Sequence, residues 1–160
     1  MIRRAESRVP GVAGFTLIEL MLVIAIMGVL ATLAVTRYLA FVERARVIRA
    51  VADIKNISST ARGYAIEIGY PPDDLTQIDS DWLLDPWLVP YRYLPLVDEN
   101  GPKNGFQARK DQFLVPLNTD FDLYSIGRDQ RTATSLARFE SQDDVVRAND
   151  GGFYGLGSRY

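Results

Sequence analysis

The sequence predicts an α+β fold, in which one long N-terminal α-helix packs on a small antiparallel β-sheet of about three strands. The first observation behind this prediction is an apolar run over residues 15–35 that continues with helical spacing to residue 68. The second is a change after Gly69 to short apolar and aromatic runs separated by turn residues. The chain has 160 residues, so a leader and a long helix leave about ninety for one small core.

The apolar run has the length of a membrane-spanning helix. Residues 15–35 are twenty-one positions without proline, and Glu19 carries their only charge. At about 1.5 Å of rise per residue, this length spans a hydrocarbon core of about 30 Å. A charged acid there is costly to insert, so Glu19 needs either a partner or a position at the lipid headgroups, about one helical turn into the segment.

The residues before the run set its orientation and its processing. Three arginines and a single acid precede it, which by the positive-inside bias keeps the N-terminus cytoplasmic and places the rest of the chain across the membrane. An ordinary secretory signal is cleaved after its apolar run, here near Val35. The small residues Gly11, Ala13 and Gly14 lie before the run instead, so cleavage among them leaves the helix on the mature protein.

The helix is expected to continue beyond the membrane as an amphipathic helix. Gly69 is a suitable C-terminal cap, and the two prolines at 71–72 prevent continuation. The predicted helix therefore extends over residues 16–68, or about 80 Å, and the alternative is a break near Thr36 that gives two helices. The expected buried stripe consists of Val47, Val51, Ile54, Ser58, Ala61, Ala65 and Ile68.

Three later segments have the composition of β-strands, namely residues 91–94, 112–117 and 121–126. Pro116 indicates a strand end or a sheet edge, and the two Asn-Gly pairs within residues 99–105 indicate a hairpin connection. Residues 151–155, Gly-Gly-Phe-Tyr-Gly, permit tight turns, and we expect their two aromatic rings to pack on the domain.

The composition argues against several classes of function. A net charge of −2 with mixed acids and bases gives no electrostatic basis for binding nucleic acid. The chain has no Cys and no His, which excludes disulfides, Ser-His and Cys-His catalysis and ordinary zinc sites. It also has no Gly-x-Ser-x-Gly and no phosphate-binding loop motif. We therefore expect that the protein is not an enzyme.

Residues 14–20, Gly-Phe-Thr-Leu-Ile-Glu-Leu, follow a short basic leader and resemble the class III signal of type IV pilins and type II secretion pseudopilins. The resemblance implies that a prepilin peptidase cuts after Gly14, that Phe15 becomes the N-methylated N-terminus, and that Glu19 supports assembly. The physical chemistry agrees with this role, because the new amine of Phe15 is positive and a neighbouring subunit's Glu19 can neutralise it in a low dielectric.

Later motifs extend the resemblance to the major pseudopilin of type II secretion systems. Asp-Pro-Trp at residues 85–87, Pro-Tyr at 90–91 and Tyr-Ser-Ile-Gly-Arg-Asp at 124–129 are similar to elements of that family in the same order. The resemblance implies the pilin fold. Residues 97–110 form a segment that is longer than the family leads us to expect.

In that family the loop after the second motif binds calcium, so the resemblance implies a Ca²⁺ site. Such a hard cation takes several oxygen ligands. A bound cation would restrain the loop by joining its two ends, which no disulfide can do in a chain without cysteine. Two alternatives remain: Arg131 or Arg138 pairs with the aspartates, or the acids are solvated and cap a helix. The implied ligands are Asp129, Asp143, Asp144 and the carbonyl of Ile126, with Asp150 as a weaker candidate.

These observations together predict four parts: a leader at 1–14, a transmembrane assembly helix at 15–36, its amphipathic continuation at 37–69 and a β domain at 70–160. The resemblance implies an inner-membrane subunit with its C-terminal domain in the periplasm, most similar to a type II secretion pseudopilin. Its implied partners are copies of itself in a helical polymer, prepilin peptidase, minor pilin-like subunits and an inner-membrane assembly platform. The alternatives are a pilin of an extracellular pilus and a monomeric membrane-anchored periplasmic binding domain, with an anchored hydrolase well behind them.

Overall fold

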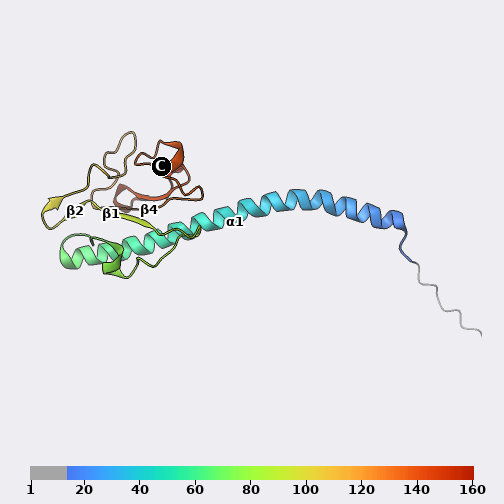
Figure 1. Cartoon of the computed structure of the whole chain (residues 1–160), viewed down its shortest axis with the longest axis horizontal. Coiled ribbons are helices and arrows are strands. Elements are labelled where there is room, and N and C mark those ends of the chain that lie inside the picture. Colours follow the sequence, from blue (N-terminus) through green and yellow to red (C-terminus); the bar gives the residue numbers. More distant parts are fainter. Residues whose placement is uncertain (1–13) are drawn as a thin grey trace, which may run out of the picture. The chain divides into compact units, whose positions relative to one another are not determined.

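The computed structural model describes residues 14–160 (Figure 1). Its chain divides into two compact units, of which the first ends at Phe41 and the second comprises Val42–Tyr160. The helix α1 (Leu17–Ile68) supplies the described helical residues of the first unit and begins the second. The predicted α+β class is confirmed.

The helix α1 begins and ends where the sequence predicts. Its C-terminus is closed by Gly69, which has a φ of 103° and donates its N–H to the carbonyl of Ala65 at 2.9 Å. A positive φ at this position is readily adopted by glycine, which explains why the helix stops there. The helix is not interrupted at Thr36, so the alternative of two shorter helices is not what the structure shows.

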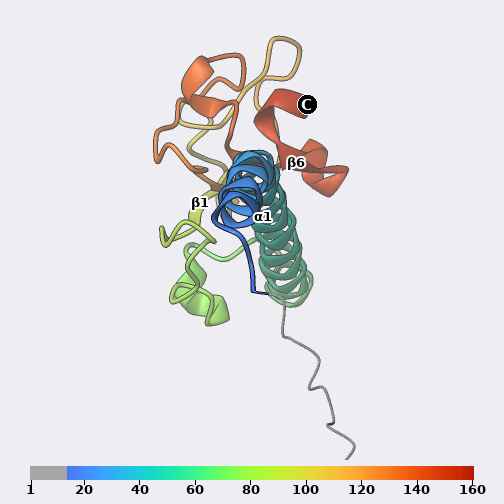
Figure 2. The ribbon, with the colours of Figure 1, turned by 90° about the vertical axis from the view of Figure 1, so that its right-hand side faces the viewer.

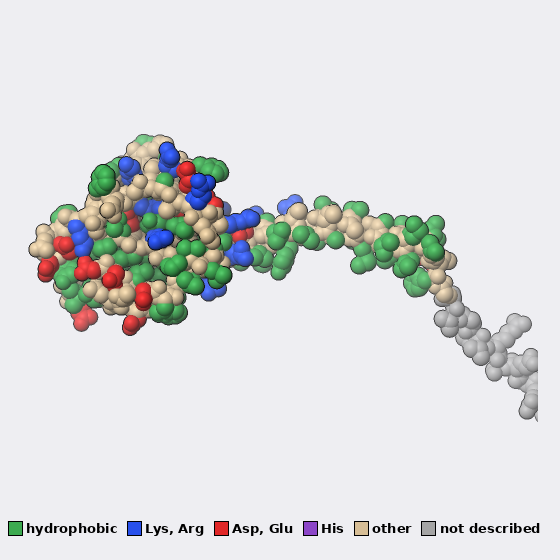
Figure 3. Space-filling view, in the orientation of Figure 1, with side chains coloured by type: hydrophobic (Ala, Val, Ile, Leu, Met, Phe, Trp, Pro, Cys, Tyr) green, Lys and Arg blue, Asp and Glu red, His purple; other side chains and the backbone are tan. Residues whose placement is uncertain are grey.

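The first unit exposes its apolar side chains on all sides of the helix. Hydrophobic side chains recur along the visible surface of this segment, with backbone showing between them (Figure 3). The hydroxyls of Thr32 and Thr36 donate to the carbonyls of Val29 and Leu33 at 2.7 and 3.0 Å, so the helix itself satisfies these polar groups. Among the described helices, α1 is the one that is long and apolar enough to cross a membrane.

The second unit contains a four-stranded antiparallel sheet in the order β1-β4-β5-β6 and a separate two-stranded hairpin, β2-β3. In the end-on view, β1 and β6 lie on either side of the helix (Figure 2). Four short 3₁₀ helices complete the unit. The strands are β1 (Arg92–Pro95), β2 (Val97–Asp98), β3 (Gly101–Pro102), β4 (Phe121–Ser125), β5 (Val145–Ala148) and β6 (Phe153–Leu156), and the 3₁₀ helices are η1 (Leu75–Ile78), η2 (Phe139–Ser141), η3 (Asn149–Gly151) and η4 (Gly157–Arg159).

The strand predictions are right in part. β1 and β4 confirm the predicted strands at 91–94 and 121–126, but the predicted strand at 112–117 is wrong. That segment pairs with no strand and lies in a loop, where Phe113 is 89 % exposed and Leu117 alone is buried. β5 and β6 were not predicted, since β5 contains the charged Arg147 and β6 contains a glycine, so the sheet has one strand more than expected.

The core of the second unit lies between one face of α1 and the sheet. Ile54, Ser58 and Ala61 of the predicted stripe are buried, whereas Ile68 is exposed. Ile57 and Ala50 belong to the buried face although the predicted stripe omitted them. The helix side of the core is formed by Ala50, Ile54, Ile57 and Ala61, and they pack with Leu75, Tyr91, Phe121, Leu123 and Val145.

Two isoleucines of α1 give a direct test of this packing. Ile57 is 1 % exposed and Ile66 is 87 % exposed. We expect Ile57→Ala to lower the free energy of unfolding by about 2–5 kcal/mol, because it leaves a cavity between helix and sheet. Ile66→Ala on the same helix should change it by less than about 0.5 kcal/mol. Urea unfolding of the full chain in detergent, followed by tryptophan fluorescence, measures both, and equal losses would contradict the described core.

Candidate functional sites: the helix start and the loop that follows β4

The first site is the start of α1, where Thr16 and Glu19 form a reciprocal cap. The Thr16 N–H and hydroxyl both donate to Glu19 Oε2 at 2.9 Å, and the Glu19 N–H donates to the Thr16 hydroxyl at 3.3 Å. This is the capping box of a helix N-terminus, in which Thr-x-x-Glu satisfies backbone N–H groups that have no partner within the helix. The Thr-x-x-Glu spacing in the sequence could have predicted the role of Thr16.

The cap leaves part of the Glu19 carboxylate open. Its Oε2 receives both donors from Thr16, whereas Oε1 has no hydrogen-bond partner among residues 14–160. The neighbouring side chains Ile18 and Leu20 are exposed and apolar. The start of the helix thus presents one unpaired carboxylate oxygen on an apolar surface, where a positive group from another molecule can reach it.

Gly14 and Phe15 precede the helix and are exposed. A Cβ atom at Gly14 would meet no atom within 4 Å, so packing within the described chain does not require glycine there. The rest of the predicted leader, residues 1–13, lies outside the described residues.

The second site joins the two motifs that resemble the major pseudopilin. Asp85 is buried, and its Oδ1 accepts the N–H groups of Trp87 and Val89 at 3.0 and 2.9 Å. Its Oδ2 accepts the hydroxyl of Ser125 at 2.5 Å, and the Ser125 oxygen accepts the Gly127 N–H at 3.1 Å. One carboxylate therefore shapes the Asp-Pro-Trp turn and ties it to the end of β4.

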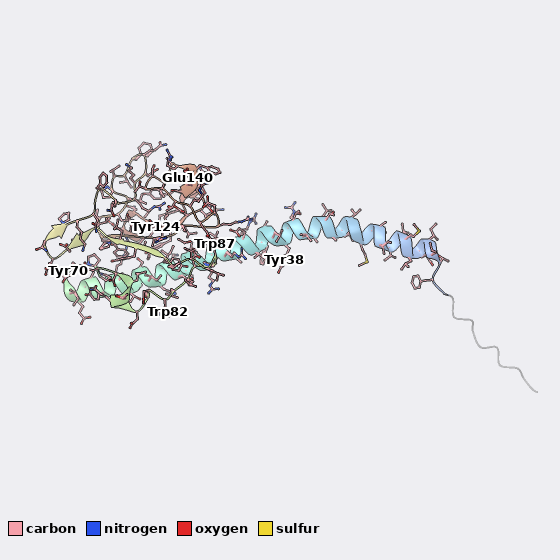
Figure 4. The ribbon with its side chains drawn as sticks, in the orientation of Figure 1. Tyr38, Tyr70, Trp82, Trp87, Tyr124 and Glu140 are labelled. Carbon is pink, nitrogen blue, oxygen red and sulfur yellow. The ribbon has the colours of Figure 1, made fainter. Side chains whose placement is uncertain are left out.

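The indole of Trp87 continues this junction toward the helix. Its Nε1 donates to the carboxylate of Glu43 on α1 at 3.2 Å. Figure 4 labels Trp87 and also Tyr124, which belongs to β4. The Asp-Pro-Trp turn thus contacts helix and sheet at once, and this explains in physical terms why the two motifs occur together.

The loop after β4 is held by Asp143. Its Oδ2 accepts the N–H groups of Arg128 and Asp129 at 2.9 and 3.0 Å. Gly127 has a φ of 68°, and a Cβ atom there would lie 2.5 Å from the carbonyl oxygen of Asp143. Only glycine fits this close approach, so the glycine of Tyr-Ser-x-Gly-x-Asp has a clear steric reason.

Asp144 points into the interior instead. It is 0 % exposed, and its Oδ2 accepts Nη2 of Arg109 at 2.6 Å and the hydroxyl of Thr132 at 2.6 Å. Arg109 is itself 3 % exposed and donates from Nη1 to the Thr132 hydroxyl oxygen at 2.7 Å. Burial raises the pKa of the Asp144 carboxyl, and the positive charge of Arg109 opposes that shift.

The predicted calcium ligands do not all converge, because Asp129 and Asp143 line one cavity whereas Asp144 is engaged by Arg109. Asp144 is engaged by Arg109, Asp143 binds two backbone N–H groups, and Asp129 Oδ1 accepts the Arg131 N–H at 2.8 Å. The weaker candidate Asp150 lies elsewhere and accepts the N–H and hydroxyl of Thr119 at 2.7 and 2.8 Å.

Within residues 14–160, no group of three or more Asp, Glu, His or Cys side chains is arranged to hold a metal ion. The carboxylates of Asp129, Asp143 and Asp144 therefore do not form a three-acid cation site in the described residues, and calcium binding stays a prediction. Neither predicted arginine pairs with these aspartates through its side chain, since Arg138 lies 3.7 Å from Glu140 and Arg131 contributes only its backbone N–H. The arginine that does so, Arg109, comes from the long segment that the sequence left unexplained.

Comparison with known proteins places these sites in a family. Residues 10–35 match the model of the prokaryotic N-terminal methylation motif, which covers Gly14, Phe15 and Glu19. The type II secretion system core protein G of Pseudomonas aeruginosa is 30 % identical over 156 residues, an alignment that covers 84 % of this chain and 92 % of that protein. The chain belongs to the core protein G family. Another member, from Dickeya chrysanthemi, is 32 % identical over 72 % of this chain and 69 % of its own length.

Pilins match a shorter part of this chain than the core protein G proteins do. A fimbrial protein of Pseudomonas aeruginosa is 43 % identical over 54 residues, which is 34 % of this chain and 35 % of the fimbrial protein. The chain thus spans about a third of the fimbrial proteins it matches but most of the core protein G chains. It is a pilin-like structural subunit. No solved structure matches the chain significantly.

The steric role of Gly127 can be tested with a second glycine as control. We expect Gly127→Ala to lower the free energy of unfolding by about 2–4 kcal/mol, because the methyl group meets the Asp143 carbonyl and the positive φ is strained. Gly63→Ala, on α1 with no atom within 4 Å of the new methyl, should be neutral or stabilising by up to about 1 kcal/mol. Urea denaturation compares the two variants, and a stable Gly127→Ala protein would refute the close approach.

Proposed function

We propose that this chain is a pseudopilin of a type II secretion apparatus, which polymerises through α1 and supports protein export without chemistry of its own. The observation that carries the proposal is the start of α1, where a carboxylate with one unpaired oxygen stands on an exposed apolar helix. A surface of this kind is unfavourable in water and is covered by lipid before assembly and by neighbouring helices after it. The names of the core protein G relatives support the same role.

Processing supplies the partner for Glu19. Cleavage after Gly14 would give Phe15 a positive amine, and a prepilin peptidase is the enzyme class that this step requires. In a low dielectric an unpaired carboxylate is costly, whereas a carboxylate paired with an amine of the adjacent subunit is not. Each added subunit would then neutralise one charge, and the pair would fix how far neighbouring helices are displaced along the filament axis.

The orientation and partners follow from the same proposal. The basic residues before the helix would keep the N-terminus cytoplasmic, so that the second unit folds in the periplasm. Minor pilin-like subunits would start the filament, and an inner-membrane platform would add subunits to it.

The matches to fimbrial proteins favour a second candidate, a pilin of an extracellular pilus. These matches are confined to about a third of the chain, whereas the core protein G matches extend through most of it. Immunoelectron microscopy of intact cells separates the two candidates, because a periplasmic filament is not labelled from outside whereas a pilus is.

The first consequence is the mass of the mature protein. We expect the chain isolated from its own cells to lack residues 1–14 and to carry one added methyl group on Phe15, because the apolar segment must be retained for assembly. Intact mass spectrometry and N-terminal sequencing measure both, and Gly14→Leu should leave the leader attached. A mature N-terminus beyond Val35 would contradict the proposal and would favour a secreted binding domain.

The second consequence separates the two roles of Glu19. Glutamine can also complete a capping box, so Glu19→Gln keeps the cap and removes the charge. Thr16→Val does the reverse, because it removes the capping hydroxyl and keeps the carboxylate. We expect Glu19→Gln to be inserted and cleaved but to lose at least about tenfold in filament yield, whereas Thr16→Val assembles.

Filaments sheared or extracted from cells and quantified by immunoblot give the measurement. Thr36→Val, which removes a hydroxyl that bonds within the helix, is the matched control for Thr16→Val. Wild-type yield from Glu19→Gln together with a defect in Thr16→Val would show that the carboxylate acts only as a helix cap.

A further inference from the structure

Arg109 lies at the centre of a buried polar cluster that joins three parts of the second unit. Its side chain reaches Asp144 and Thr132, and its backbone N–H donates to Asp122 Oδ2 at 2.6 Å. Its guanidinium carbon lies 4.1 Å from the centre of the Tyr124 ring. The residue therefore contacts β4, the residue before β5 and the loop between these two strands.

The backbone of residues 109–110 adds further hydrogen bonds, one to Leu117 and two to the same loop. The carbonyl of Arg109 accepts the Leu117 N–H at 2.7 Å. Lys110 donates its N–H to the Thr134 carbonyl at 2.9 Å and accepts the Leu136 N–H at 3.0 Å. Residues 109–110 thus bond the loop that extends from Gly127 to Asp144 at Thr132, Thr134, Leu136 and Asp144.

We propose that Arg109 is a built-in cation that closes this loop, so that the second unit folds without a divalent metal ion. The loop is the one in which the family resemblance implies Ca²⁺, and its innermost acid, Asp144, is already neutralised by the guanidinium. A divalent cation bound to Asp144 would face the positive charge of Arg109 in a buried environment, where like charges repel strongly. Of the remaining acids, Asp143 accepts two backbone N–H groups on Oδ2 and Asp129 accepts one on Oδ1.

The chemistry of the site favours an arginine over a lysine. The planar guanidinium donates from two nitrogens to two different oxygens, Thr132 Oγ1 and Asp144 Oδ2, while its face lies over the Tyr124 ring. An ammonium is a single point charge and cannot reproduce this fork and stacking together. Among the described residues, Oδ1 of Asp144 and Nε of Arg109 have no hydrogen-bond partner, so the cluster is held by Oδ2 of Asp144 and the two terminal nitrogens of Arg109.

The first measurement is the melting temperature of the full chain in detergent, followed by tryptophan fluorescence in EDTA and in millimolar CaCl₂. We expect the wild-type chain to melt at the same temperature in both. A ligand that binds the folded state raises this temperature, so a higher melting point in CaCl₂ than in EDTA would overturn the proposal.

The second measurement uses substitutions. Arg109→Met should lower the melting temperature by about 10 °C or more in either solution, because it leaves Asp144 buried without its partner. Arg109→Lys should lie between Arg109→Met and the wild type. Arg131→Met and Arg138→Met change exposed arginines near the same loop and should melt as the wild type does. A wild-type melting temperature for Arg109→Met would also overturn the proposal.

A double substitution keeps the test decisive if Arg109→Met fails to fold. Arg109→Met with Asp144→Leu removes both charges, so the double variant should melt above Arg109→Met alone. A double variant that melts as low as the single one, or lower, would show that the two residues do not act as a pair. The inference does not rest on filament formation, because every measurement concerns the folding of the second unit.

Discussion

One continuous helix has to satisfy two different surroundings, and the rest of the structure depends on this constraint. Over its first part α1 exposes apolar side chains on every side, whereas from Ala50 to Ala61 it buries a single face against the sheet. The first pattern suits lipid or a bundle of like helices, and the second suits a small globular core. The hydroxyls of Thr16, Thr32 and Thr36 therefore bond within the helix, which leaves Oε1 of Glu19 as the open polar atom at its start.

The second unit uses buried charge where a secreted domain of this size commonly uses disulfides. The chain has no cysteine, and two arginines are almost completely buried. Arg147 donates to both oxygens of Asp120 at 2.7 and 2.6 Å and to the Phe121 carbonyl at 2.8 Å, and Arg109 pairs with Asp144. Replacing a complete pair of this kind by apolar residues can be neutral, but removing one member is costly. The two pairs thus make strand pairing specific. For example, β5 must lie where Arg147 reaches the Phe121 carbonyl of β4 and the carboxylate of Asp120, the residue before β4.

Sequence reasoning succeeded where the signal is local. The helix boundaries follow from periodicity and from the glycine and prolines after Ile68, and the Thr-x-x-Glu spacing was sufficient to predict the cap even though it was overlooked. It failed where a distant partner decides the structure. β5 reads as a broken apolar run because the sequence does not show that Arg147 meets Asp120 across 27 positions. Residues 112–117 look like a strand but lie in a loop, since only tertiary contacts decide which apolar segments join a sheet. The role of Arg109 was missed for the same reason, because its partner Asp144 lies 35 positions further along the chain.

The placement of the core separates assembly from folding. The core clusters of the second unit draw on α1 from Val47 onward, and no described core residue comes from the first unit. The positions that the family motif covers, including Gly14, Phe15 and Glu19, therefore lie where substitutions do not reach the packing of the domain. The reverse holds for Asp85, Gly127 and Asp144, which fix the loop and the sheet and lie outside the apolar segment. A subunit built in this way can change the surface of its apolar segment and the loops of its domain independently, because the described core draws on the second unit alone.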